Sequence, residues 1–172
     1  MRVNAKVVAV GLIALMGAVS SAWAEGNATR GKALAYTCLG CHGIANYKNV
    51  YPTYSVPKLV GQHPEYIVAA LKAYKSKERS HATMHAQASS LSEQDMQDIA
   101  VYLAGAPLKS GGTAIGTAPG KVTELCVACH GKDGVGITVE YPTVAGQHAD
   151  YIERALDEYK KGGRKNAVMP AF

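Results

Sequence analysis

The sequence predicts an all-α fold built from two related helical domains in tandem. Two observations carry this prediction. A Cys-x-x-Cys-His motif occurs twice, at residues 38–42 and 126–130, and these motifs hold all four cysteines of the chain. A helix-forming segment follows each motif, and the same residue types recur in both at a constant offset, as in Tyr66 and Tyr151. A repeat of this kind indicates that one structural unit has been duplicated.

Residues 1–24 predict a secretory signal peptide. Arg2 and Lys6 are followed by an apolar run, Val7–Val19, and a small-x-small cleavage site ends at Ala24. The run is shorter than the roughly 20 residues that span a bilayer. We therefore expect cleavage after about Ala24 and a mature chain in the periplasm. An uncleaved membrane anchor is the alternative.

The charge and size of the mature chain limit the classes of function. Residues 25–172 carry 16 Lys and Arg against 13 Asp and Glu, a net charge of +3, compared with +5 for the whole sequence. Nothing in the sequence resembles the basic stripe of a nucleic-acid-binding protein. The length suffices for two small domains, but domains of this size have little core of their own. We expect a bound cofactor to supply part of each core.

The repeated motif is the attachment signature of c-type haem. Two thiols one helical turn apart reach the two vinyl groups on one edge of a porphyrin and form thioethers with them. The adjacent histidine then offers an imidazole nitrogen to the iron. The sequence predicts two covalently bound haem c groups, attached at Cys38 and Cys41 and at Cys126 and Cys129, with His42 and His130 as iron ligands.

Other uses of paired cysteines fit less well. A zinc site built from two Cys-x-x-Cys pairs has about 15–20 residues between the pairs, whereas a far longer stretch of chain separates Cys41 from Cys126. Two disulfides or a redox-active dithiol stay open in an exported protein. Neither gives a reason for histidine, and then glycine, to follow both pairs.

The first half predicts three helices. A short helix spans residues 27–38, with Asn27 or Thr29 as its cap, and a loop with two prolines follows over residues 43–62. Pro64 begins a second helix whose apolar residues recur at helical spacing. Its basic end is expected to face solvent and comprises Lys72, Lys75, Lys77 and Arg79. The third helix begins with a capping-box pattern at Ser92 and ends near Gly105.

A linker and a second set of helices complete the chain. Residues 106–118 are rich in Gly, Pro, Ser and Thr and predict an interdomain linker. The expected domains are residues 25–105 and 119–172. In the second domain, a short helix runs from Pro119 into Cys126, a loop covers 131–146, and a helix covers 149–161.

The repeat also points to the second iron ligands. The offset that pairs Tyr66 with Tyr151 also places Met84 on Met169, in surroundings that the sequence predicts to be polar and non-helical. A methionine thioether on the face opposite the histidine favours reduced iron, so Met84 and Met169 are the candidate ligands. Met96 is assigned to packing. Four histidines compete: His63 and His148, expected to cap a helix or face solvent, and His81 and His85, which flank Met84.

With these motifs in order, the chain resembles the bacterial periplasmic dihaem cytochromes c of the c-four type, built from two class I cytochrome c domains. The resemblance covers nearly the whole mature chain. It implies that Cys38, Cys41, His42 and Met84 serve the first haem, and that Cys126, Cys129, His130 and Met169 serve the second. It also implies that the carbonyls of Pro57 and Pro142 accept hydrogen bonds from the two iron-ligating histidines.

The sequence departs from this family after the last methionine. The first half continues from Met84 to Leu103, through a capped helix, whereas the second half stops at Phe172, soon after Met169. The second domain is therefore expected to lack its C-terminal helix. An incomplete chain, a partner that supplies the helix, and a more open second haem are the three explanations.

The resemblance implies electron transfer without enzymatic activity. Expected partners are redox proteins, either a membrane oxidase or a dehydrogenase, with no nucleic acid. Peripheral membrane association and oligomeric state are left open. Competing hypotheses are a haem subunit of a larger dehydrogenase, a peroxidase that uses an open second haem, and a dithiol oxidoreductase.

Overall fold

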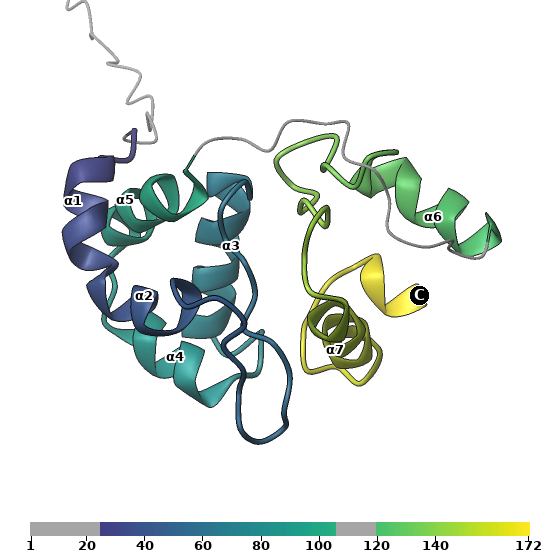
Figure 1. Ribbon diagram of the computed structural model, residues 1–172, viewed down its shortest axis with the longest axis horizontal. Helices are drawn as coiled ribbons and strands as arrows, with labels where there is room; N and C mark the ends of the chain where they lie inside the picture. The colour runs from purple at the N-terminus through teal and green to yellow at the C-terminus, as the bar shows by residue number, and fades with distance from the viewer. Residues whose placement is uncertain (1–24, 106–119) are drawn as a thin grey trace, which may run out of the picture.

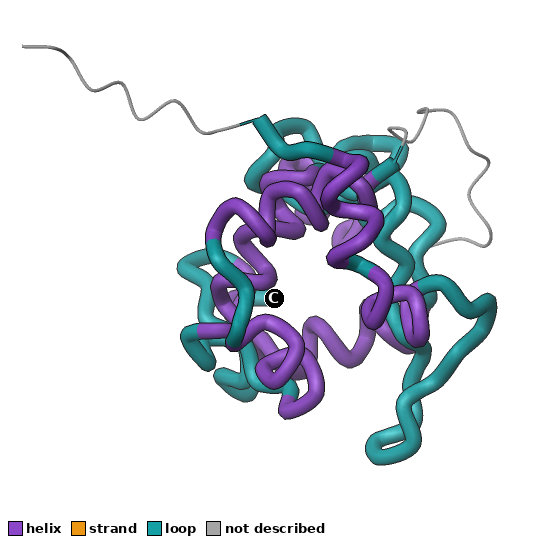
Figure 2. Tube along the Cα trace, turned by 90° about the vertical axis from the view of Figure 1, so that its left-hand side faces the viewer, coloured by secondary structure: helices purple, strands orange, loops and turns teal. Residues whose placement is uncertain are grey.

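The computed structural model describes residues 25–105 and 120–172, and it confirms the all-α class (Figure 1). The first half contains α1 Ala28–Leu34, α2 Tyr36–His42, α3 Pro64–Lys75, α4 Ala82–Ser89 and α5 Glu93–Ala104. The second half contains α6 Gly120–His130, α7 Ala149–Lys160 and a 3-10 helix, η1 Met169–Ala171. Helices and loops make up these two ranges, and their β-pairing is limited to two isolated bridges (Figure 2).

Parts of the predicted organisation lie outside the described ranges. These parts are the signal peptide over residues 1–24 and the linker over residues 106–118. The domain boundaries therefore stay a prediction. Within the two described ranges, no helix combines the length and the apolar character needed to cross a membrane.

The hydrophobic core of the described residues lies in the first half, where α5 packs against α1 and α3. The crossing of α1 and α5 depends on Gly31, because a Cβ at this position would lie 1.9 Å from the carbonyl oxygen of Asp98. Asp98 is 1% exposed and accepts hydrogen bonds from the backbone of Asn27 and the side chain of Arg30. A close helix crossing and a buried carboxylate therefore fix the N-terminal helix in place.

The N-terminal segment forms two helices where the sequence predicted one. Asn27 caps α1, accepting from the backbone N–H of Arg30 at 3.0 Å, which is one of the two predicted caps. The chain turns at Ala35, and α2 then continues to His42. The prediction that the helix ends at Cys38 was wrong, and the whole first motif is helical.

The segment around Met84 was predicted to be non-helical, and this prediction was wrong. The ring of His81 accepts a hydrogen bond from the backbone N–H of Met84 and thereby caps α4. Met84 and the fully buried Ala88 pack against the core that α3 helps to form. A histidine cap and tertiary packing stabilise this helix, and neither has a strong sequence signal. The capping box predicted at Ser92 is present, with Asp95 as its partner.

The second half buries its helices less completely. Leu71 on α3 is 8% exposed, whereas its counterpart Leu156 on α7 is 40% exposed. In the first half α5 packs on α3, while in the second half η1 packs on α7 and the sequence ends at Phe172. From Met169 onward, the described residues form η1 and no further helix.

Candidate functional site

The first motif presents its histidine in a fixed orientation. Helix α2 carries Cys38 and, one turn later, Cys41 and His42. The Nδ1 of His42 donates a hydrogen bond of 2.8 Å to the carbonyl oxygen of Pro57. This bond is the one that the resemblance implied. Because Nδ1 holds the proton, Nε2 keeps its lone pair for a metal. Burial lowers the pKa of His42, which favours the neutral imidazole that an iron ligand requires.

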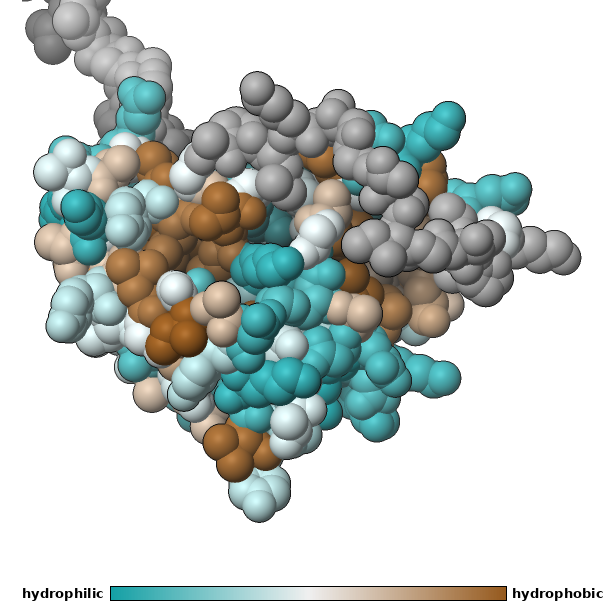
Figure 3. All heavy atoms as spheres, viewed as in Figure 1, coloured by the Kyte–Doolittle hydropathy of each residue, from teal (hydrophilic) through white to brown (hydrophobic). Residues whose placement is uncertain are grey.

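Met84 and two residues of the first motif share one hydrophobic core. Met84, Cys38 and Leu39 are partly buried and all pack against the same hydrophobic core. Apolar side chains gather over the centre of the first-half helices (Figure 3). An apolar surface of this kind suits a porphyrin macrocycle, since contact with it removes part of the ring from water.

The histidines that flank Met84 are already engaged. The Nδ1 of His81 accepts from the backbone N–H of Met84 at 3.2 Å, so the proton of its neutral ring is on Nε2. In that tautomer His81 has no free lone pair for iron. The Nδ1 of His85 bonds the carbonyl oxygen of Tyr74 at 2.9 Å. The contact of His81 therefore argues against His81 as the ligand. His85 keeps the lone pair of its Nε2 when Nδ1 donates, as His42 does, and stays the alternative to Met84.

The second motif repeats the arrangement of the first. It occupies the last turns of α6, and the Nδ1 of His130 donates to the carbonyl oxygen of Pro142 at 2.8 Å. Met169 begins η1, where the side-chain oxygen of Asn166 accepts from the backbone N–H groups of Val168 and Met169, both at 2.9 Å. Asn166 thus holds the turn that carries the second candidate ligand.

All four cysteines are free thiols in the structure, as haem attachment requires. Cys38, Cys41 and Cys129 are partly buried, and Cys126 is exposed. Burial raises the pKa of the Cys38 thiol. The disulfide alternative therefore finds no support in the geometry.

The two halves contact each other at an interface around Arg79 and Arg164, which we call the seam. Contacts across the seam follow an approximate two-fold axis. Arg79 and its counterpart in the repeat, Arg164, form an isolated antiparallel bridge. On one side of it the N–H of Ser80 donates to the carbonyl of Gly163 at 2.7 Å. On the other side Lys165 donates in the same way to Glu78 at 2.9 Å. Ser80 corresponds to Lys165 in the repeat, and Glu78 corresponds to Gly163, so each of these two bonds is the counterpart of the other. The repeat in the sequence is therefore also a symmetry of the structure.

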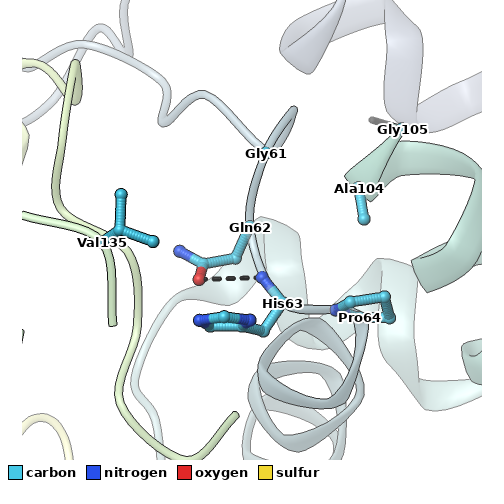
Figure 4. Close-up of a pocket in the computed structure, with 7 residues that line it drawn as sticks. All are labelled: Gly61, Gln62, His63, Pro64, Ala104, Gly105 and Val135. Atoms are coloured by element: carbon cyan, nitrogen blue, oxygen red, sulfur yellow. Dashed lines mark hydrogen bonds between the residues drawn. The ribbon is translucent and has the colours of Figure 1, made fainter. Parts of the chain in front are cut away.

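Two glutamines extend this symmetry. The side chain of Gln62 donates to the carbonyl of Thr143 at 3.0 Å and accepts from its N–H at 2.9 Å. Gln147 makes the same pair of bonds with Lys58, at 2.9 and 3.0 Å. Figure 4 shows Gln62 pointing toward the loop of the second half that carries Val135. Four reciprocal hydrogen bonds between a glutamine side chain and the backbone of the other half therefore hold the halves together.

The histidines beside these glutamines directly precede α3 and α7, where the sequence predicted either a cap or exposure to solvent. His63 and His148 occupy N-cap positions, but their side chains make no cap hydrogen bond. Instead, Gln62 and Gln147 accept from the backbone N–H groups of these histidines, both at 3.1 Å. The Nε2 of His63 lies 3.3 Å from the carbonyl oxygen of Gly136, which places it against the second half.

Arg79 was predicted to face solvent, and this prediction was wrong. It is 7% exposed, and Arg164 is 5% exposed. The guanidinium of Arg79 lies 4.7 Å from the ring centroid of Tyr74 and donates to the hydroxyl of Tyr151 at 2.7 Å. Burial alone would raise the pKa of Tyr151, but Arg79 and Arg164 outweigh that effect and lower it. The recurrence of arginine in both halves was the signal in the sequence for this buried pair.

One nitrogen atom of Arg79 indicates which group the haem site can hold. The Nε of Arg79 is buried and has no hydrogen-bond partner among the described residues. A buried donor without a partner is costly, and a haem propionate is an anionic acceptor of the right kind. Together with the apolar surface and the free Nε2 of each motif histidine, this unpaired donor shows that the residues fit haem.

The fold and these sites define the class: a helical c-type cytochrome whose two halves each present one haem-attachment motif. The family model for cytochrome c matches residues 28–107. Cytochrome c4 of Pseudomonas aeruginosa is 34% identical over 91% of this chain and 83% of its own length. The chain therefore belongs to the cytochrome c4 family. It is a periplasmic electron-carrying cytochrome with two covalently bound haem c groups.

Two further comparisons bear on structure and partners. The cytochrome c4 structure from Acidithiobacillus ferrooxidans superposes with a TM-score of 0.62, is 31% identical, and is matched over 80% of this chain and 88% of its own. A thiosulfate dehydrogenase electron acceptor of Stutzerimonas stutzeri is 31% identical over 91% of this chain and 80% of its own length. The family thus includes relatives named for electron exchange with another redox protein.

Proposed function

We propose that this cytochrome carries electrons between respiratory redox partners in the periplasm, for example towards a terminal oxidase. The observation that carries the proposal is the hydrogen bond from a motif histidine to a proline carbonyl, 2.8 Å long in both halves. The same bond at both sites fixes two imidazoles in the orientation that axial ligation needs. Two equally prepared sites suit a carrier, in which each iron has the same task.

The proposal gives each residue a distinct role. Cys38 and Cys41 attach the first haem and Cys126 and Cys129 the second. His42 with Met84 and His130 with Met169 would hold the two irons. When bound, each haem supplies a one-electron ferrous–ferric couple. Two fixed protein ligands at each site keep water and substrates from the iron and limit structural change between redox states.

The methionine ligands and the histidine–proline hydrogen bonds shift the reduction potential in opposite directions. A thioether ligand favours the ferrous state and raises the reduction potential. The hydrogen bonds to Pro57 and Pro142 increase the basicity of His42 and His130, which favours the ferric state. Arg79, with its free Nε in the seam, is placed to pair with a propionate carboxylate.

A second candidate function is the electron-accepting subunit of a dehydrogenase. The relatives named thiosulfate dehydrogenase electron acceptors favour it, since they match this chain over most of its length. In that role electrons would enter from one dedicated enzyme, and the cytochrome would bind that enzyme stably.

Rapid-mixing kinetics separate the two functions. The reduced protein is mixed with membranes that contain terminal oxidases, and oxidation of both haems is followed by absorbance. We expect complete oxidation that cyanide, an oxidase inhibitor, abolishes. Oxidation that is absent or insensitive to cyanide, together with co-elution with a dehydrogenase and reduction by that enzyme's substrate, would overturn the proposal in favour of the second function.

A further inference from the structure

A hydrogen-bond acceptor lies three residues before each candidate methionine. The Nδ1 of His81 accepts from the backbone N–H of Met84 at 3.2 Å, and the side-chain oxygen of Asn166 accepts from the backbone N–H of Met169 at 2.9 Å. His81 and Asn166 also occupy matching positions of the repeat, at the offset that pairs Met84 with Met169. The same hydrogen bond therefore occurs at the same place in both halves.

The two acceptors are different residue types. Asparagine is common in this role, because its side-chain oxygen reaches backbone N–H groups two and three residues further on, as Asn166 does with Val168 and Met169. Histidine is not among the preferred helix caps, yet His81 caps α4 in the same way. Two unlike side chains with one contact in common indicate that the position requires an acceptor.

The backbone just before each acceptor is tied to the opposite half. The N–H of Ser80 donates across the seam to the carbonyl of Gly163 at 2.7 Å, and the N–H of Lys165 donates to the carbonyl of Glu78 at 2.9 Å. These two donors directly precede the two acceptors in the sequence. Each acceptor thus follows a backbone position that a hydrogen bond across the seam fixes.

The ring of His81 is also held within its own half. It meets the ring of Tyr74 edge-on, with the ring centroids 6.2 Å apart, and Tyr74 is 8% exposed in the core. A side chain that is already fixed loses little freedom when it accepts a hydrogen bond. The bond to the N–H of Met84 therefore holds the backbone that carries this methionine.

We propose that His81 and Asn166 are positioning residues, which hold the backbone of Met84 and Met169 so that each thioether stays on its iron. The proposal rests on the proposed function, in which these two methionines are iron ligands. Groups that orient a metal ligand from outside the metal's own shell strengthen its binding. Without the acceptor, the turn that begins at the cap opens more often, and the methionine leaves the iron in a larger fraction of molecules.

The test measures how readily an added ligand displaces each methionine. The ferric holoprotein is titrated with imidazole, and binding is followed by absorbance and counted per haem. We expect His81→Ala to bind imidazole about fivefold more tightly at about half of its haem, because loss of a cap destabilises the turn by about that factor. Asn166→Ala should do the same at the other half, and the double variant at both haems.

A rescue variant separates the acceptor from the histidine ring. His81→Asn places at the first position the side chain that serves at the second, and it should bind imidazole as weakly as the unsubstituted protein does. If His81→Asn behaves like His81→Ala, the acceptor is not what holds Met84, and the inference is overturned.

Ser92→Ala is the matched control, because it removes a cap from a helix that carries no candidate ligand. The Ser92 hydroxyl caps α5 by accepting from the backbone N–H of Asp95 at 3.1 Å. Its loss should lower stability by a similar factor and leave the affinity for imidazole unchanged. An effect on imidazole binding as large as that of His81→Ala would show a general loss of stability and contradict the proposal.

The absorption band that ferric haem shows only with a sulfur ligand separates the two possible failures. With this band present in the unsubstituted protein, unchanged imidazole affinity in both alanine variants would overturn the inference alone. Absence of the band in the unsubstituted protein would instead overturn the ligand assignment of the proposed function. Should His81→Ala fail to fold, Asn166→Ala carries the test, since Asn166 is exposed and lies outside the core.

Discussion

Replacing Met84 by leucine is expected to give a reduced protein that binds carbon monoxide at about half of its haem. Leucine has a similar volume and keeps the packing against the first-half core. It has no sulfur, so the iron proposed to be bound by Met84 loses a ligand and opens one coordination position. The midpoint potential of that site should fall as well, because the thioether favours ferrous iron. Titration with carbon monoxide, followed by absorbance, measures the fraction.

Met96→Leu is the matched control for this prediction. Met96 is 1% exposed in the core, on the face of α5, and it is assigned to packing alone. Its replacement should leave carbon monoxide binding at the level of the unsubstituted protein. If Met84→Leu also fails to bind carbon monoxide, Met84 is not the ligand, and His85 becomes the next candidate since its Nε2 is free to ligate when Nδ1 donates to Tyr74.

Replacing Asp98 by asparagine is expected to reduce the free energy of unfolding by about 2 kcal/mol at neutral pH. The 1% exposed carboxylate accepts from the backbone of Asn27 and from the side chains of Arg30 and Gln94. The loss should be visible as a lower midpoint in urea unfolding, monitored by circular dichroism. Asp157→Asn, at an exposed ion pair, should change stability by no more than about 0.5 kcal/mol.

The loss of stability in Asp98→Asn should depend on pH in a defined direction. The N–H of Asn27 holds the pKa of Asp98 below its ordinary value. A carboxylate with a lowered pKa in the folded state stabilises the protein above its unfolded pKa, about 3.9, and loses that contribution as the pH falls through the folded value. The difference between the unsubstituted protein and Asp98→Asn should therefore be constant near pH 6–7 and shrink below about pH 4. A difference that grows on acidification would contradict this account.

The sequence revealed the parts of the molecule that repeat. Spacing alone located both motifs, and the constant offset between the halves paired Pro57 with Pro142, whose carbonyls accept the two histidine hydrogen bonds. The long helices were also predictable, because α3 and α5 combine helical periodicity with clear start signals, and α7 repeats the periodicity of α3. These features depend on local sequence or on repetition, and both can be read without coordinates.

The features that the sequence did not reveal depend on contacts between distant residues. Helix α4 relies on a histidine cap and on packing against the core, so its local pattern resembled a loop. Arg79 ends a basic run and looked solvent-exposed, but the second half buries it against Tyr151. The ion pair of Arg164 with Glu158 has no match at Arg79, because the counterpart of Glu158 in the repeat is Ala73. In each case a tertiary contact outweighed the local pattern.

The measurement that tests the central claim most directly is carbon monoxide binding by the unsubstituted, fully reduced protein, counted per haem. The proposed ligands, His42 with Met84 and His130 with Met169, occupy both axial positions of each iron. The account therefore predicts no binding at either haem. Uptake by about half of the haem would contradict it and would identify one iron as open, with the site of Met169 as the first to examine, because η1 is short and α7 is incompletely covered.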